Sequence, residues 1–134
     1  MYLTSVYAAI LGLMLLMLGI RTLRLRRRLG IPIGDEGNSA MLRAMRVQAN
    51  FVEYVPMTLL LILLLELQGG SLFVVNLLCL LLLAGRSVHA IGVSRVVEDY
   101  RFRVFGMAMT FASLALSASY LIVLGLVSRL DSLS

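Results

Sequence analysis

Tryptophan and lysine are absent from this sequence of 134 residues, and cysteine and histidine occur only once each. Because Cys79 is alone, the chain cannot form an internal disulfide, and His89 has no second histidine with which to share a structural zinc ion, so we expect no metal site. Charged residues make up 14% of the chain, against about 25% in ordinary soluble domains. This composition excludes a soluble globular enzyme, a disordered tail and a disulfide-stapled secreted domain.

Apolar residues are abundant instead: they make up 60% of the chain, and the mean hydropathy is +0.97. Residues 1–20 carry no charge and, as a helix, would reach about 30 Å, the thickness of the hydrocarbon core. We interpret this run as a retained first helix and not as a signal peptide, because it ends in an arginine-rich segment where a cleavage site would need small residues.

The pattern predicts an all-α integral membrane protein, a four-helix bundle with up-down-up-down topology in a single domain, 1–134. We expect Asn38 or Ser39 to cap the second helix. The expected helices are about 1–23, 39–68, 71–94 and 103–128.

The distribution of positive charge predicts an orientation. All twelve basic residues are arginines, and eleven of them lie in or beside the first and third connections. By the positive-inside rule, that side is cytoplasmic and both termini are outside. The isoelectric point of about 10.1 therefore does not indicate nucleic-acid binding, because the arginines are concentrated at the membrane boundary. Their simplest roles are topology signalling and contact with anionic headgroups.

A polar stripe begins the second helix. Arg43, Arg46, Asn50 and Glu53 are separated by 3, 4 and 3 residues, so on a helix they share an arc of roughly 80°. Ionisable residues inside a membrane are costly and are therefore functional candidates. Arg46 and Glu53 are about 10 Å apart along the axis and would not saturate each other, which favours a groove for an extended zwitterionic ligand. The alternative is an interhelical clamp in which Glu53 pairs with an arginine of the third or fourth helix.

Three segments resemble a known family. Residues 43–56 show the pattern R-A-x-R-x-x-x-N-x-x-E-Y-x-P, which resembles the second-helix signature of the MAPEG family, the membrane-associated proteins in eicosanoid and glutathione metabolism. Residues 85–89 resemble the G-R-x-x-H of its prostaglandin-E-forming branch, and residues 103–107 are similar to the R-x-x-G-M of bacterial members. The resemblance covers nearly the whole chain and is greatest to the short bacterial members.

This resemblance implies a homotrimer in the bacterial inner membrane that binds glutathione as co-substrate between subunits, near the cytoplasmic face. The implied activity is a glutathione-dependent transferase or peroxidase acting on lipophilic electrophiles or lipid hydroperoxides from the bilayer. Arg103 matches the family's catalytic arginine, with Arg101 as a fallback; a cation beside a thiol lowers its pKa from about 8.5 and favours the nucleophilic thiolate. The implied glutathione-binding residues are Arg43, Arg46, Gln48, Asn50, Glu53, Tyr54, Arg86 and His89.

Other interpretations stay open. Val93 stands where the eicosanoid enzymes have a tyrosine, which puts part of the glutathione site in question. His89 could be a buried structural histidine, and Arg103 could face headgroups. A non-catalytic lipid-binding or scaffold trimer of the same fold is the alternative function; a small transporter is less consistent, since residues 1–20 contain no acidic residue. Glu66 ends the second helix, where we expect it to lie in water.

Overall fold

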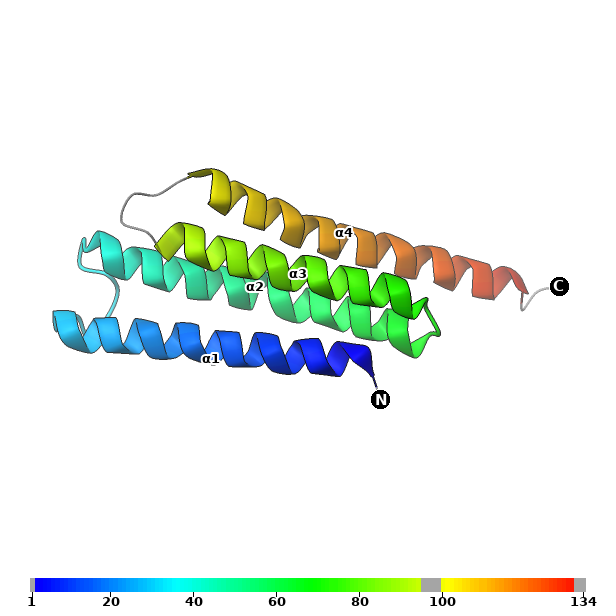
Figure 1. Cartoon of the computed structure of the whole chain (residues 1–134), viewed down its shortest axis with the longest axis horizontal. Helices are drawn as coiled ribbons and strands as arrows, with labels where there is room; N and C mark the ends of the chain where they lie inside the picture. Colours follow the sequence, from blue (N-terminus) through cyan, green and yellow to red (C-terminus); the bar gives the residue numbers. More distant parts are fainter. Residues whose placement is uncertain (1, 95–99, 132–134) are drawn as a thin grey trace.

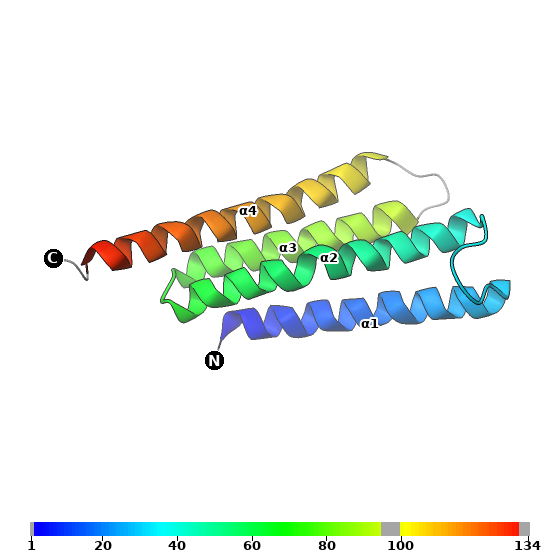
Figure 2. The same cartoon turned by 180° about the vertical axis from the view of Figure 1, so that it is seen from behind.

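The computed structural model describes residues 2–94 and 100–131 and places them in four helices packed side by side (Figures 1 and 2). These are α1 (Leu3–Leu29), α2 (Ser39–Leu67), α3 (Leu72–Ser94) and α4 (Tyr100–Asp131). No strand occurs in these ranges, and each helix is long and apolar enough to cross a membrane. The prediction of an all-α four-helix membrane bundle is confirmed.

The end of α1 lies further along the chain than expected. The helix continues through the arginine-rich segment to Leu29, and Gly30 ends it in the left-handed conformation (φ 69°), its N–H donating to the carbonyls of Arg26 and Arg27. Arginines in a last helical turn interact favourably with the helix dipole, which explains why the charged run stays helical. Asn38 caps α2, as predicted: its side chain accepts hydrogen bonds from the backbone N–H groups of Ala40 and Met41.

One of these arginines also anchors the first loop. The guanidinium of Arg26 donates to the carbonyl oxygens of Ile31 and Gly34, each at 3.1 Å, and to the sulfur of Met45 at 3.5 Å. The end of α1 is thereby tied to the loop and to the first turns of α2. This arginine therefore has a structural role as well as adding to the positive charge at that end of the bundle.

The α3–α4 contact is the closest in the bundle. A Cβ atom added to Gly106 would come within 2.6 Å of the His89 nitrogen and 2.7 Å of the Gly85 carbonyl oxygen, so the two backbones touch here. Further along α4, the buried hydroxyl of Ser113 donates to the carbonyl of Leu78 on α3 at 2.9 Å. Small and hydroxyl side chains allow such close packing in membranes. An apolar cluster of the core joins α1, α2 and α3 through Leu11, Leu18, Val47, Phe51, Val55 and Leu82.

Glu66 is not in water. It is only 9% exposed, and its carboxylate accepts hydrogen bonds from the backbone N–H groups of Leu3 (2.5 Å) and Thr4 (2.9 Å). The first turn of α1 has no side-chain cap of its own, because Tyr2 occupies the N-cap position. The carboxylate at the end of α2 satisfies these N–H groups and sits at the positive end of the α1 dipole. The expectation of an exposed Glu66 was therefore wrong, since this contact spans sixty-two residues of sequence.

Candidate functional site

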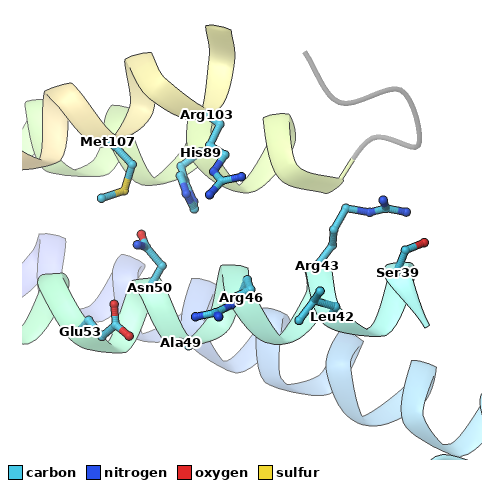
Figure 3. Close-up of a pocket in the computed structure, with 10 residues that line it drawn as sticks. All are labelled: Ser39, Leu42, Arg43, Arg46, Ala49, Asn50, Glu53, His89, Arg103 and Met107. Atoms are coloured by element: carbon cyan, nitrogen blue, oxygen red, sulfur yellow. The ribbon is translucent and has the colours of Figure 1, made fainter. Parts of the chain in front are cut away.

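A polar cavity of about 540 Å³ opens between α2 and the α3–α4 pair (Figure 3). This volume lies within the range of about 300–1,000 Å³ typical of small-molecule sites. Figure 3 shows the α2 side chains along one side, with His89 of α3 and Arg103 and Met107 of α4 facing them. The lining residues are Ser39, Leu42, Arg43, Arg46, Ala49, Asn50, Glu53, His89, Arg103 and Met107.

All four residues of the predicted α2 stripe line this cavity, together with His89 and Arg103. The stripe faces the cavity because its 3–4–3 spacing keeps its members on one side of α2, while another face of the helix packs into the core through Phe51 and Val55. The glycine contact between α3 and α4 brings His89 and Arg103 to the same wall. Of the two arginines considered for the catalytic position, the structure places Arg103 at the cavity, whereas Arg101 borders a separate apolar groove on α4.

The cavity contains an excess of positive charge. Three guanidinium groups, those of Arg43, Arg46 and Arg103, line it with a single carboxylate among the described residues, that of Glu53. Across the described ranges 2–94 and 100–131, the Glu53 carboxylate forms no hydrogen bond or ion pair. The stripe is therefore not neutralised by the interhelical clamp that the sequence left open. Glu53 and Arg46 are exposed at the rim, where a ligand could reach them.

Arg86 lies behind the cavity wall and holds Asn50. Its side chain is only 1% exposed, and its guanidinium donates to the Asn50 side-chain oxygen at 2.6 Å, to the Asn50 carbonyl at 3.4 Å and to the Met107 sulfur at 3.2 Å. Its Nε finds no partner in the part of the chain that the structure describes. Since Arg86 occupies the Asn50 amide oxygen, the amide NH₂ is the group left for a ligand. Arg86 is thus placed to position Asn50.

Besides Arg86, two more of the predicted binding residues, Gln48 and Tyr54, do not line the cavity of a single chain. Tyr54 packs edge-on against Phe111 of α4, with ring centroids 5.0 Å apart. Gln48 faces α1, where its side-chain nitrogen is 3.7 Å from the position of a Cβ on Gly19. The side chain of Val93 lies outside the described residues.

Met107 is a cavity residue that sequence reasoning missed. It was not among the predicted site residues, yet it borders the cavity and accepts a hydrogen bond from Arg86. Its position four residues after Arg103, one helical turn along the same face, was the available signal. The remaining lining residues that were not predicted are Ser39, Leu42 and Ala49.

Comparison with known proteins identifies the family of the chain. The family model described as MAPEG family matches residues 4–123. The inner membrane protein YecN of Escherichia coli strain K12 is 33% identical over 113 residues, which cover 84% of this chain and 85% of that protein; YecN of Escherichia coli O6:H1 gives the same values. No solved structure is significantly similar to the chain. With a family match over nearly its whole length, the chain belongs to the MAPEG family.

Proposed function

We propose that this protein is a membrane-embedded, glutathione-dependent transferase or peroxidase acting on lipophilic electrophiles or lipid hydroperoxides. The observation that carries the proposal is the cavity with three arginines and one glutamate that pairs with no described residue. Its net charge selects an anionic ligand, and the lone carboxylate gives a place for one ammonium group. Family membership supports the same class of ligand.

The donor set fits glutathione, which has two carboxylates, one ammonium group, two amides and a thiol. Arg43 and Arg46 would hold carboxylates through paired N–H donors. The Asn50 NH₂, oriented by Arg86, would bind a peptide carbonyl or carboxylate, and Glu53 would bind the ammonium group. Charges of opposite sign at separate points along α2 would fix the direction in which the ligand lies.

Arg103 is the proposed catalytic residue. When bound, glutathione supplies a thiolate that forms a carbon–sulfur bond at an electrophilic carbon as a leaving group such as chloride departs, or reduces a hydroperoxide to an alcohol and water as two glutathione molecules become the disulfide. A guanidinium beside the sulfur lowers the thiol pKa, because the charged thiolate then has a fixed counter-charge in a site of low dielectric. Arg103 lines the cavity opposite the α2 stripe, which is a suitable position for this role (Figure 3).

We further propose a homotrimer in the bacterial inner membrane, with the arginine-rich end in the cytoplasm and both termini outside. The end of α1 and the starts of α2 and α4 meet at one end of the bundle, and the start of α1 and the end of α4 lie at the other (Figure 1). The exposed cavity rim at Arg46, Ala49 and Glu53 leaves a surface that a neighbouring subunit could cover. The relative YecN is named as an inner membrane protein. Native mass spectrometry in detergent tests the trimer, and accessibility of single cysteines in intact cells tests the orientation.

The activity is tested by titrating the detergent-purified protein with glutathione and assaying conjugation of chlorodinitrobenzene. We expect Arg103→Gln to lower kcat about tenfold at neutral pH, since loss of an adjacent cation raises the thiol pKa by about one unit or more. Arg101→Gln is the matched control, because it removes the same charge from the same turn but outside the cavity. Absence of binding at millimolar glutathione would refute the enzymatic proposal, and equal activity of the two variants would refute the role of Arg103.

A further inference from the structure

His89 is a buried side chain of the polar cavity that has no part in the reaction proposed above. It is only 5% exposed, and its ring faces the α2 stripe together with Arg103 (Figure 3). In the part of the chain that the structure describes, this ring forms no hydrogen bond. A histidine that served only to fill the core would have a hydrogen-bond partner, because buried polar groups are seldom left without one. The ring nitrogens are therefore available to a ligand in the cavity.

The contact between α3 and α4 places His89 beside Arg103. A Cβ on Gly106 would lie 2.6 Å from the His89 backbone nitrogen and 2.9 Å from its Cα, so the two helices touch at these residues. Arg103 precedes Gly106 by three residues, which is less than one helical turn. Both side chains enter the cavity from this wall. The imidazole thus lies next to the position proposed for the glutathione sulfur.

The imidazole differs from the other ionisable groups of the cavity. Arg43, Arg46 and Arg103 keep their protons at physiological pH, and Glu53 provides the carboxylate for the ammonium group. Among the described residues that line the cavity, His89 alone carries a group that can both accept and release a proton under these conditions. The guanidinium groups repel a proton held on the ring, so an imidazolium formed there would pass it readily to a strong base.

The two acceptor classes of the proposed reaction differ in their need for such a group. Chloride leaves an electrophilic carbon without a proton, the thiol proton can pass to water, and a cation beside the sulfur is enough to stabilise the thiolate. Cleavage of a peroxide O–O bond instead releases an alkoxide, a strong base that needs a proton as it leaves. A proton-transferring histidine beside the thiolate therefore serves hydroperoxide reduction and adds little to conjugation.

We propose that His89 carries a proton from the glutathione thiol to the oxygen that leaves a hydroperoxide substrate. The proposal rests on the glutathione-dependent function above. The imidazole accepts the thiol proton, and the thiolate sulfur attacks the terminal peroxide oxygen. The S–O bond forms, the O–O bond breaks, and the imidazolium protonates the alkoxide to give an alcohol. The glutathione sulfenic acid formed in this step reacts with a second glutathione, which releases water and gives the disulfide.

The test compares two acceptors with the same detergent-purified, full-length protein: cumene hydroperoxide, whose leaving group needs a proton, and chlorodinitrobenzene, whose leaving group does not. We expect His89→Gln to lower kcat for cumene hydroperoxide about a hundredfold, a usual contribution of general acid–base catalysis. Glutamine can hydrogen-bond but cannot carry a proton, so kcat for chlorodinitrobenzene and the Kd for glutathione should stay within about threefold of the wild type. Arg103→Gln is the matched control, because loss of the thiolate's counter-charge should lower both activities alike.

A second variant separates proton transfer from packing. His89→Ala removes the ring, and added imidazole should then restore hydroperoxide reduction without affecting conjugation. Equal loss of both activities in His89→Gln would show that the histidine binds glutathione or supports the fold, and it would overturn the proposal. Conjugation without any reduction of cumene hydroperoxide in the wild type would overturn it too, although the glutathione-dependent function would stand. Absence of glutathione binding would refute both.

Discussion

Replacement of Gly106 by alanine tests the packing that forms the candidate site. The added Cβ would lie 2.6 Å from the His89 nitrogen and 2.7 Å from the Gly85 carbonyl oxygen. Both are backbone atoms of α3, so no side chain can rotate away. To restore an ordinary contact of 3.4 Å, the helices must separate by roughly 0.8 Å.

Such a separation has two costs. Overpacking a well-packed contact typically costs about 1–3 kcal/mol, and a gap of 0.5–1 Å forfeits about a quarter to a half of each dispersion contact nearby. We therefore expect Gly106→Ala to lower the free energy of unfolding by about 3 kcal/mol, and Tm by about 10 °C. Because Gly106 lies between Arg103 and Met107, the displacement should also weaken glutathione binding.

Gly125→Ala is the matched control, in the same helix. A Cβ at this position would meet nothing within 4 Å, and alanine is the better helix former by about 1 kcal/mol, so stability should be unchanged or slightly raised. Both variants can be compared by thermal unfolding in detergent, followed by circular dichroism, with glutathione affinity measured in parallel. If Gly106→Ala and Gly125→Ala had the same Tm, the direct backbone contact between α3 and α4 would be refuted.

Three other substitutions test individual contacts. Glu66→Ala should lower the unfolding free energy by about 1–2 kcal/mol, measured by thermal unfolding, because the first N–H groups of α1 lose their acceptor. Arg86→Met should weaken glutathione binding about tenfold in titration, since Asn50 loses the partner that orients its amide, while stability should hold or rise because an uncompensated buried charge is removed. Ser113→Ala should cost about 1 kcal/mol in the same unfolding assay through loss of its bond to Leu78.

Each of these has a contrary outcome. Unchanged melting of Glu66→Ala would show that the carboxylate does not cap α1. Unchanged glutathione affinity in Arg86→Met would show that Asn50 does not need Arg86 to position it. A large loss of unfolding free energy in the same variant would show that the hydrogen bonds of the buried guanidinium stabilise the bundle. For Ser113→Ala, the neighbouring exposed Ser119 provides a control, because its replacement by alanine should have no effect.

Composition and periodicity were sufficient to predict the membrane class, the four helices and the polar stripe on α2. These properties are local: a run of apolar residues must form a helix in hydrocarbon to satisfy its own backbone, and a 3–4–3 spacing places side chains on one face wherever the helix lies. Arg43, Arg46, Asn50 and Glu53 could therefore be assigned to one face before any partner helix was known. The resemblance to a family then added His89 and Arg103 from other helices.

The tertiary structure decided what faces that stripe. Three findings depend on contacts between different helices. Glu66 of α2 accepts hydrogen bonds from the start of α1, and Arg86 of α3 donates to Asn50 of α2. Met107 of α4 lines the cavity beside the α2 stripe. Which of two nearby arginines reaches the cavity depends on the rotation of α4, and the glycine contact with α3 sets that rotation. Hydropathy and spacing repeat along one helix and contain no information about its rotation against another, so packing alone determines these contacts.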